Sequence, residues 1–453
     1  MERKKWMSID RSFYRSVCML VLPMALQNLI NVAVHSADVV MLGKLGETAL
    51  SASSLAGQVQ FIMTLFFFGL TSGAAVLTAQ YWGKGDLPTI EKIIGIALRF
   101  SLVMSFAFMA AVLLFPAQVM RIFTPEPDVI QEGIKYLRIV CLAYPLMGFT
   151  MIYLNIMRSV ERVVVSTMVY LCSLVANVIL NALLIFGLCG FPRLGIQGAA
   201  IATLIARALE LVIVVFYDRR MNRVVNFHFS SLWARDRLLF RDFLHFSIPV
   251  TLNELMWGLG TSMNAVVIGH LGSAAVAANS VAQVARQLAT VIAFGIANAT
   301  AILIGKAIGE NSYDKAQLYA KRLTRLTLIT GTLGALIILC VRPFLMETMN
   351  LSELACGYLS VMMFVMSYFV IAQSFNTTMV VGVFRAGGDT RFGLFLDVST
   401  MWGCSILLGA VCAFFLHWSV PAVYIVLLSD EIIKIPLTAL RYKSKKWLRN
   451  VTR

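Results

Sequence analysis

The segment YRSVCMLVLPMALQNLINVAVHSADVVMLGKLG, residues 14–46, decides the fold of this chain. It is an apolar run that follows a basic flank, and it contains a single acidic residue, Asp38. About 20 apolar residues in a helix are enough to cross the hydrocarbon core of a bilayer. With about 100° of turn per residue, the side chains of Gln27, Asn31 and Asp38 point within about 40° of one another. The segment therefore predicts a membrane-spanning helix with one polar face, on which the carboxylate is a candidate functional group.

The composition places the whole chain in the membrane. Of its 453 residues, 59% are hydrophobic and 13% are charged, whereas a soluble domain has about 25% charged residues. Backbone polar groups in lipid must be satisfied within their own segment, so these apolar runs predict an all-α polytopic membrane protein. The net charge of +15 lies in the loops and does not indicate nucleic acid. The eight cysteines form no CxxC pair, which argues against a disulfide or zinc framework.

Twelve membrane spans are predicted from the apolar runs. Basic residues gather in alternate connections, including the N-terminal flank, residues 82–92 and the C-terminal tail. Positively charged loops stay in the cytoplasm, so we expect a multi-pass protein of the plasma (inner) membrane with both termini cytoplasmic. The predicted spans are about 14–40, 49–81, 93–115, 133–157, 164–188, 196–217, 243–268, 275–305, 320–341, 354–382, 392–416 and 420–440.

The two halves of the chain repeat one another. When residue n is aligned with residue n+226, Pro23 meets Pro249 and Gly43 meets Gly269, and no gap is needed from residue 23 to residue 83. Each half has six spans, an even number, so the halves should share one orientation. The predicted regions are an N-lobe with helices one to six at 1–217, a cytoplasmic connector at 218–242, a C-lobe with helices seven to twelve at 243–441, and a basic cytoplasmic tail at 442–453.

Several motifs occur in an order that is typical of one transporter family. They include Asp38-Val-Val-Met-Leu-Gly-Lys-Leu-Gly46, Ile268-Gly-His-Leu-Gly272, Ala79-Gln-Tyr-Trp-Gly-Lys-Gly85, Asn177-Val-Ile-Leu-Asn181 and Arg385-Ala-Gly-Gly-Asp-Thr390. Each motif is weak alone. In this order, and with the repeat, they make the chain resemble the bacterial multidrug and toxic compound extrusion (MATE) transporters over nearly its whole length. The resemblance implies two repeat-related six-helix bundles (6+6) that form a V and work by alternating access.

The resemblance also implies a function. A protein of this kind would be a secondary active antiporter that exports amphipathic, often cationic, organic compounds in exchange for inward H⁺ or Na⁺. Its partners would be small organic substrates and the lipid bilayer, and it would need no cofactor besides the coupling ion. We expect a monomer.

Other function classes fit the sequence less well. A lipid-linked oligosaccharide flippase of related architecture is the alternative, but its pyrophosphate would call for a cavity lined by several cations, and the deep cations here are few: Arg207, Arg286 and Lys434. A channel would not need acids in both lobes. No P-loop indicates ATP-driven transport, and no Ser/His/Asp, CxxC or HExxH constellation indicates an enzyme.

Asp38 is the leading candidate for cation coupling. In the resembling family, a first-helix acid belongs to a cation site that the fifth and sixth helices complete, and the matching positions here are Asn177, Asn181 and Thr203. An amide stands at Asn181 where the family has a second acid. Na⁺ binding at Asp38 stays possible with neutral oxygens, whereas for H⁺ one buried carboxylate is enough. Gln27 and Asn31, on the same helical face, are further candidates for coupling or gating, and His35 is a weaker one.

A second polar site is predicted in the C-lobe. Glu254 lies on helix seven, Arg286 on helix eight and Asn376 on helix ten, and Asn264 is the repeat counterpart of Asp38. We expect Glu254 to pair with Arg286, either as a switch or as a permanent structural pair.

Further charges lie deep in the predicted spans of both lobes. Asp397 is either a third coupling acid or a partner of Arg385 or Arg391, and we favour the partner role. Close opposite charges predict local pairing between Arg207 and Glu210, and likewise among Asp430, Glu431 and Lys434, with gating as the alternative.

Overall fold

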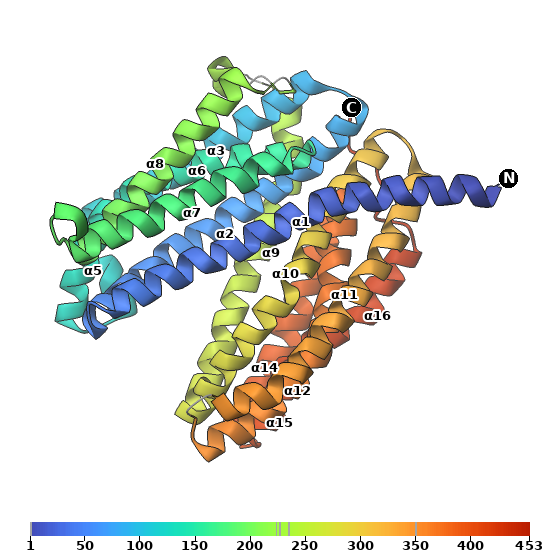
Figure 1. Ribbon diagram of the computed structural model, residues 1–453. Coiled ribbons are helices and arrows are strands. Elements are labelled where there is room, and N and C mark those ends of the chain that lie inside the picture. The colour runs from blue at the N-terminus through green and yellow to red at the C-terminus, as the bar shows by residue number, and fades with distance from the viewer. Residues whose placement is uncertain (1, 223, 226–227, 234–235, 349–350) are drawn as a thin grey trace. The chain divides into compact units, whose positions relative to one another are not determined.

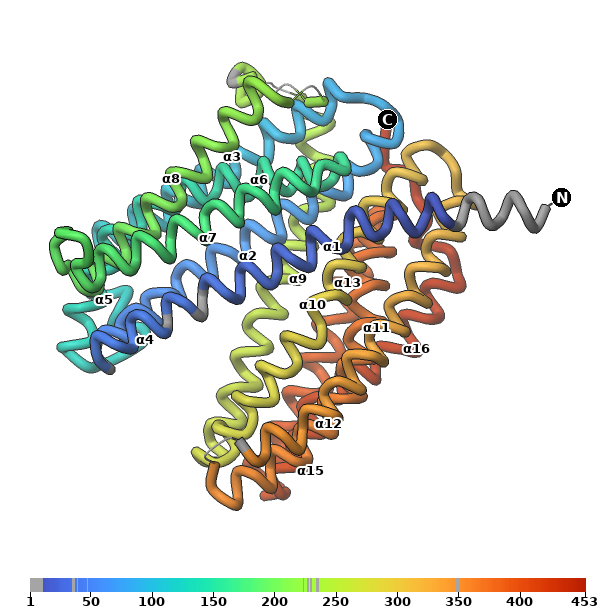
Figure 2. The backbone as a smooth tube through the Cα atoms, in the orientation of Figure 1, coloured from blue at the N-terminus to red at the C-terminus, as the bar shows by residue number. Residues whose placement is uncertain are grey.

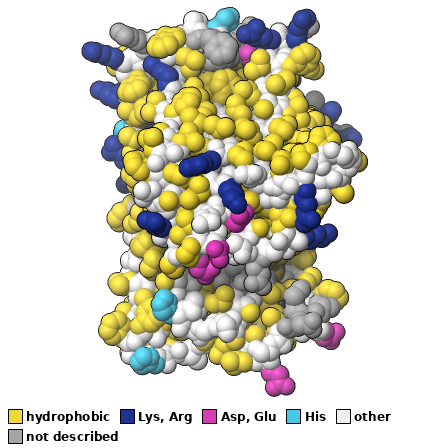
Figure 3. Space-filling model, turned by 90° about the vertical axis from the view of Figure 1, so that its left-hand side faces the viewer, with side chains coloured by type: hydrophobic (Ala, Val, Ile, Leu, Met, Phe, Trp, Pro, Cys, Tyr) yellow, Lys and Arg dark blue, Asp and Glu magenta, His cyan; other side chains and the backbone are white. Residues whose placement is uncertain are grey.

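The computed structural model describes the backbone of residues 2–222, 224–225, 228–233, 236–348 and 351–453, drawn as a tube in Figure 2. Side chains are described throughout these ranges except at 2–10, 35, 36, 39, 47, 229 and 348. The regular elements in these ranges are all helices, so the predicted all-α fold is confirmed. Ten helical stretches of the described chain are long and apolar enough to cross a membrane. Hydrophobic side chains cover much of the face shown in Figure 3, as a lipid-facing surface requires.

The chain forms two compact units, which divide inside two long helices, α1 (Glu2–Gly43) and α9 (Arg237–His270). One unit contains Leu26–Thr251, and the other contains Met1–Ala25 and Leu252–Arg453. Each division falls two residues after a proline inside the helix, Pro23 in α1 and Pro249 in α9. These prolines are matched in the sequence repeat, so the two helices divide at equivalent positions.

The first unit, Leu26–Thr251, is a bundle in which α2, α3, α6, α7 and α8 run along one another (Figure 1). Its core includes the buried side chains of Phe67, Leu137, Tyr144 and Ile185. The predicted span 133–157 is interrupted by a short 3-10 turn, η1, next to Pro145. Its elements are α2 (Glu47–Lys84), α3 (Leu87–Leu114), α4 (Pro116–Phe123), α5 (Pro127–Val140), η1 (Cys141–Ala143), α6 (Tyr144–Ser159), α7 (Val163–Phe186), η2 (Leu188–Gly190), α8 (Ile196–Arg220) and η3 (Phe229–Trp233).

The start of α9 packs tightly within this first unit. A Cβ atom on Gly73 of α2 would lie 2.4 Å from the Cα atom of Ser247, and one on Gly69 would lie 2.4 Å from the Cα atom of Thr251. Glycine at these two positions therefore permits close backbone contact between α2 and α9. Phe243 of α9 also stacks on Phe100 of α3, with ring centroids 5.9 Å apart.

The second unit is a bundle centred on α10, α11 and α12. Its main core includes the buried side chains of Leu359, Met363, Met366 and Val423. Two π-helical segments, η4 and η5, interrupt its helices, and such segments are frequent at functional sites. Its elements are α10 (Ser273–Gly309), α11 (Tyr313–Thr348), α12 (Glu353–Thr377), η4 (Thr378–Phe384), α13 (Thr390–Asp397), η5 (Val398–Ile406), α14 (Leu407–Phe414), α15 (Val420–Leu427) and α16 (Asp430–Lys443).

Candidate functional site

A pocket of about 530 Å³ lies inside the unit Leu26–Thr251. Its volume is in the range of about 300–1,000 Å³ that is usual for small-molecule sites. Five helices place polar groups on its wall, among them Gln58 on α2, Asp38 on α1, Tyr136 on α5, Asn177 on α7 and Thr203 on α8. The structure thus brings Asp38, Asn177 and Thr203 to one pocket, where the sequence placed them.

Asp38 is held by the fifth predicted span. The Asn181 side-chain amide donates to Asp38 Oδ1 at 2.5 Å and to Asn177 Oδ1 at 3.2 Å. Asn177 and Asn181 lie one turn apart on α7 and are both buried, so they share a helical face. A hydrogen bond to a carboxylate is stronger than one between neutral groups. The α7 amides therefore fix the position of the Asp38 carboxylate on the pocket wall.

An ion pair between Arg207 and Glu210 adds two further charges to the lining of this pocket. Arg207 Nη1 lies 2.7 Å from Glu210 Oε1, as predicted from their spacing on α8, and both residues line the pocket. Glu210 also accepts a hydrogen bond from Thr150 Oγ1 at 3.4 Å. With its two acids and one base ionised, the described lining carries a net charge of −1. The pocket is electrically suited to one positive charge.

The other polar residues of α1 differ in their roles. Asn31 lines the pocket. Gln27 is buried against α7 instead, where its amide donates to Thr167 Oγ1 at 2.7 Å and its carbonyl accepts from Arg158 Nη1 at 3.2 Å. The side chain of His35 lies outside the described residues. Of the three residues on this helical face, Gln27 therefore packs between helices, whereas Asn31 and Asp38 line the pocket.

A smaller pocket of about 190 Å³ lies inside the unit that contains α10–α16. Asn264, the counterpart of Asp38, lines it together with Arg286, Tyr424, Asp430 and Glu431. Arg286 donates from Nε to Gln283 Oε1 at 2.7 Å and from Nη1 to Gln373 Oε1 at 3.3 Å. Arg286 therefore lies among amide oxygens on one wall, with carboxylates elsewhere in the lining.

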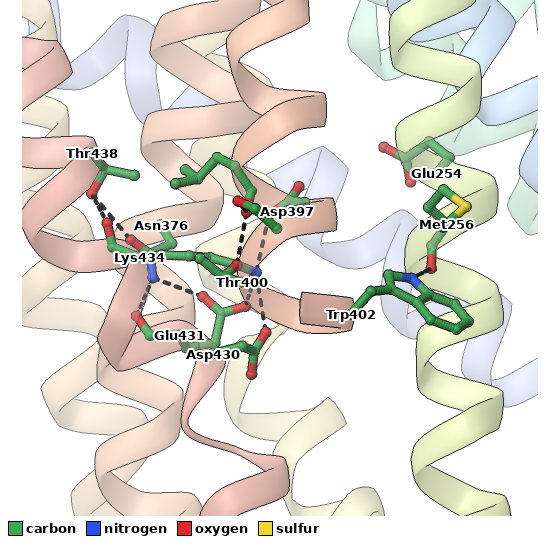
Figure 4. A network of polar contacts seen from close by, with 12 residues as sticks. Glu254, Met256, Asn376, Asp397, Thr400, Trp402, Asp430, Glu431, Lys434 and Thr438 are labelled. Atoms are coloured by element: carbon green, nitrogen blue, oxygen red, sulfur yellow. Dashed lines mark hydrogen bonds and ion pairs between the residues drawn. The ribbon is translucent and has the colours of Figure 1, made fainter. Parts of the chain in front are cut away.

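The predicted pair of Glu254 and Arg286 is wrong. Glu254 Oε1 lies 2.7 Å from Arg385 Nη2, and both side chains are largely buried. Figure 4 shows Glu254 on α9, well apart from the group of acids around Lys434. The prediction joined charges on polar faces of two neighbouring helices, and such faces do not give the depth of a side chain along the bundle. Arg385, which directly follows η4, is the partner of Glu254, whereas Arg286 donates to glutamine side chains.

Asp397 also has a different partner from the predicted ones. Its Oδ1 atom lies 3.0 Å from Lys434 Nζ, so the expected pairing with Arg385 or Arg391 is wrong. Arg391 lies near the start of α13 and Asp397 at its end, so the two side chains are separated along the helix, and the Asp397 carboxylate contacts α16 instead. The predicted local contacts of Lys434 with Asp430 and Glu431 are confirmed, at 3.1 and 3.2 Å.

Asn376 belongs to this same group rather than to the pocket lining. Its Nδ2 atom donates to Glu431 Oε2 at 2.8 Å, and its Oδ1 atom accepts from Thr438 Oγ1 at 3.3 Å (Figure 4). The sequence did not single out Tyr136, Tyr170 or Tyr424 as pocket residues, although all three line a pocket. The repeat offered a signal for one of them, since Tyr170 aligns with Asp397 at an offset of 227.

Comparisons with known proteins agree on one family. The MatE family model matches residues 23–183 and 249–439. A probable multidrug resistance protein NorM of Rhizobium meliloti is 28% identical over 399 residues, covering 86% of this chain and 84% of that protein. The probable multidrug resistance protein YoeA of Bacillus subtilis is 23% identical over 418 residues, covering 91% of this chain and 90% of that protein.

Solved structures share the fold at low sequence identity. An outward-facing multidrug resistance MATE family transporter of the MOP superfamily superposes with a TM-score of 0.86 at 18% identity, covering 95% of each chain. A MATE structure in the bent conformation gives a TM-score of 0.87 at 17% identity, covering 96% of this chain and 95% of that one. These matches confirm the predicted twelve-helix membrane architecture. With the family model spanning both halves of the repeat, this multi-pass membrane protein belongs to the MatE family of transporters.

Proposed function

We propose that this transporter exports amphipathic organic cations across the plasma membrane in exchange for protons, with Asp38 as the coupling acid. The pocket of the unit Leu26–Thr251 carries the proposal, because its lining has a net charge of −1 and a volume suited to a small organic molecule. Relatives such as NorM and YoeA are named as probable multidrug resistance proteins, which supports drug efflux as the physiological role.

The surroundings of Asp38 favour a proton over Na⁺ as the coupling ion. One of its carboxylate oxygens already accepts the Asn181 amide, and the other acid of the pocket, Glu210, is held by Arg207. A proton needs a single carboxylate, so Asp38 is sufficient for it. Na⁺ as coupling ion is the alternative that the experiment below distinguishes.

Competition for one negative charge is enough for exchange. A proton that binds Asp38 from outside cancels the net charge of the pocket and weakens its hold on a cation. When the proton leaves on the inside, the negative pocket again favours a cationic substrate. The difference in affinity between the two states sets the strength of coupling. The same net charge of −1 opposes a pyrophosphate, so the pocket does not support the flippase alternative.

The membrane orientation and the organisation of the chain are part of the proposal. Basic residues at the N-terminal flank, in the connector 218–242 and in the tail 442–453 support a cytoplasmic location for both termini by the positive-inside rule. The N-lobe at 1–217 and the C-lobe at 243–441 then share one orientation and act in alternating access as a monomer.

Uphill efflux from proteoliposomes of purified protein tests the proposal. Tetraphenylphosphonium serves as the cationic probe, and H⁺ and Na⁺ gradients are imposed separately. We expect the H⁺ gradient to drive efflux, and Asp38→Asn to abolish it. Asp128→Asn is the matched control, since it removes an equal charge from an exposed site on α5 of the same unit. Efflux driven by Na⁺ alone would contradict proton coupling.

A further inference from the structure

Lys434 lies at the centre of three carboxylates. Its Nζ atom is 3.0 Å from Asp397, 3.1 Å from Asp430 and 3.2 Å from Glu431 (Figure 4). The Lys434 side chain is 3% exposed, and those of Asp430 and Glu431 are each 9% exposed. An ammonium group has three N–H donors, so each carboxylate receives one of them. The lysine is fully engaged, but it supplies one positive charge to three negative ones.

The excess negative charge is costly in this buried place. Two uncompensated carboxylates in a low-dielectric interior favour the binding of a proton to one of them. Arg286, on the wall of the adjoining pocket, supplies a second positive charge, and it makes no ion pair with a carboxylate of the described residues. When Arg286 is counted, the three acids and two bases leave a net charge of −1. One proton makes the group neutral.

The adjoining pocket offers an independent sign of a site. The hydroxyl oxygen of Tyr424 on α15 is buried and has no hydrogen-bond partner among the described residues, although Tyr424 is 1% exposed. Tyr424 lines the pocket together with Asp430 and Glu431. A buried hydroxyl without a partner is costly unless water or another group reaches it. The Asp430 and Glu431 carboxylates and this hydroxyl thus border the same pocket inside the unit.

The charged and titratable neighbours of this group come from four elements. Asp430, Glu431 and Lys434 lie on α16, Asp397 ends α13, Arg286 faces them from α10 and Tyr424 from α15. The neighbour from α12 is the neutral amide of Asn376, which donates to Glu431. The Lys434 ammonium already occupies the centre of the carboxylates, where a metal ion would otherwise bind. This arrangement favours a proton over Na⁺ as the ligand.

The surrounding backbone is suited to respond to protonation. Asp397 immediately precedes the π-helical segment η5, and Asn376 lies two residues before η4. Loss of the Lys434–Asp397 contact would therefore act at the start of η5, and a change at Glu431 would act near the start of η4 through Asn376.

We propose that Asp397, Asp430, Glu431 and Lys434 form a second proton-binding site, whose one exchangeable proton is bound and released during transport. This inference rests on the proposed proton-coupled export, but it concerns residues of a different unit from the Asp38 pocket.

Infrared spectra of the full-length protein in lipid, titrated from acid to alkaline pH, test the site without any substrate. The C=O absorption of a protonated carboxyl group reports the bound proton. In Glu431→Gln the remaining charges balance, so we expect the protonation step of this group to disappear. In Arg286→Met the negative excess grows, so the step should move to more alkaline pH.

Further variants distinguish a failure of this second site from a failure of the Asp38 proposal. Asp38→Asn should retain the step, so a failure of the Asp38 proposal would leave this one standing. In proteoliposomes, Glu431→Gln should move fewer protons per tetraphenylphosphonium than the unsubstituted protein. Size-exclusion chromatography verifies that each variant is folded, and Asp397→Asn replaces any variant that is not. If Glu431→Gln and Asp397→Asn both kept the protonation step at an unchanged midpoint, the second site would be ruled out.

Discussion

The buried pair of Glu254 and Arg385 illustrates how single residues hold the second unit together. Its N···O distance is 2.7 Å, with side-chain exposures of 12% and 5%. Removing one partner of a buried ion pair leaves an uncompensated charge and typically costs about 3–5 kcal/mol, whereas removing both is much less harmful. The pair therefore has a structural role that can be measured apart from transport.

Arg385→Met should lower the thermal unfolding temperature clearly, because Glu254 is then left buried without its partner. The double variant Glu254→Gln/Arg385→Met should recover much of the loss. Thermal unfolding in detergent, followed by tryptophan fluorescence, measures both. A double variant less stable than Arg385→Met alone would refute this reading of the pair.

The sequence grouped some of the site residues as the structure does and assigned others the wrong partners. Asp38, Asn177 and Thr203 line one pocket, and the resemblance to a family had already grouped them. Arg286 was paired wrongly and Asp397 was given the wrong partners, because these contacts join helices far apart in the chain. The central position of Lys434 depends on the depth at which α13 and α16 cross, and no periodicity encodes that depth.

At the scale of the helices, α2 approaches the start of α9 very closely at two of its glycine residues. A Cβ atom on Gly73 would lie 2.4 Å from the backbone of Ser247, so any side chain forces the helices apart. Gly73→Ala should cost about 1–3 kcal/mol, as overpacking does. Gly57→Ala on the same helix is the control, since a Cβ atom there meets nothing within 4 Å and alanine favours the helix. Unfolding temperatures of the two variants should move in opposite directions, and equal shifts would exclude the packing explanation.

Asp236 begins α9 as its N-terminal cap, outside the membrane-spanning segments. Its Oδ1 atom accepts the Leu239 backbone N–H at 3.1 Å, and its Oδ2 atom lies 3.3 Å from Lys92 Nζ. The Leu239 bond, aided by Lys92, holds the pKa of Asp236 below its usual range, although burial partly opposes the shift. Because the pKa is lowered on folding, this carboxylate stabilises the protein fully above about pH 4 and less as the pH falls through the lowered value.

Asp236→Ala should therefore lower the stability by about 1 kcal/mol at neutral pH. The difference in stability between Asp236→Ala and the unsubstituted protein should become smaller at acid pH. Asp236→Asn keeps a capping oxygen and should lose less. Unfolding temperatures across a pH series measure this, and a deficit in Asp236→Ala that grew toward low pH would contradict the sign.

The helices themselves were largely predictable, and their irregularities were not. Long apolar runs fixed the spans because lipid leaves few alternatives to a helix. The apolar pattern predicts continuous helices where the structure has the π-helical segments η4 and η5. The predicted span 420–440 is divided into α15 and α16 at Leu428 and Ser429. These irregular places adjoin Asp397 and Asp430, where packing around buried charges decides the backbone.

At the scale of the whole molecule, the repeat gives the two units pockets at equivalent positions with different chemistry. Asp38, Thr203 and Arg207 in the first unit align with Asn264, Asp430 and Lys434 in the second. Asp38 and Thr203, like Asn264 and Asp430, line the pocket of their own unit. An acid on the first helix of one half is thus replaced by acids on the last helix of the other. The scaffold and the exchanged residues follow from the repeat, whereas the two pockets that these residues line are seen only in the structure.

The central claim is that Asp38 couples proton entry to export. Uphill tetraphenylphosphonium efflux from proteoliposomes under an imposed H⁺ gradient tests it most directly, with Asp38→Asn compared with Asp128→Asn. The account predicts that Asp128→Asn transports like the unsubstituted protein and that Asp38→Asn moves the probe only down its own gradient. Normal uphill efflux by Asp38→Asn would contradict the account.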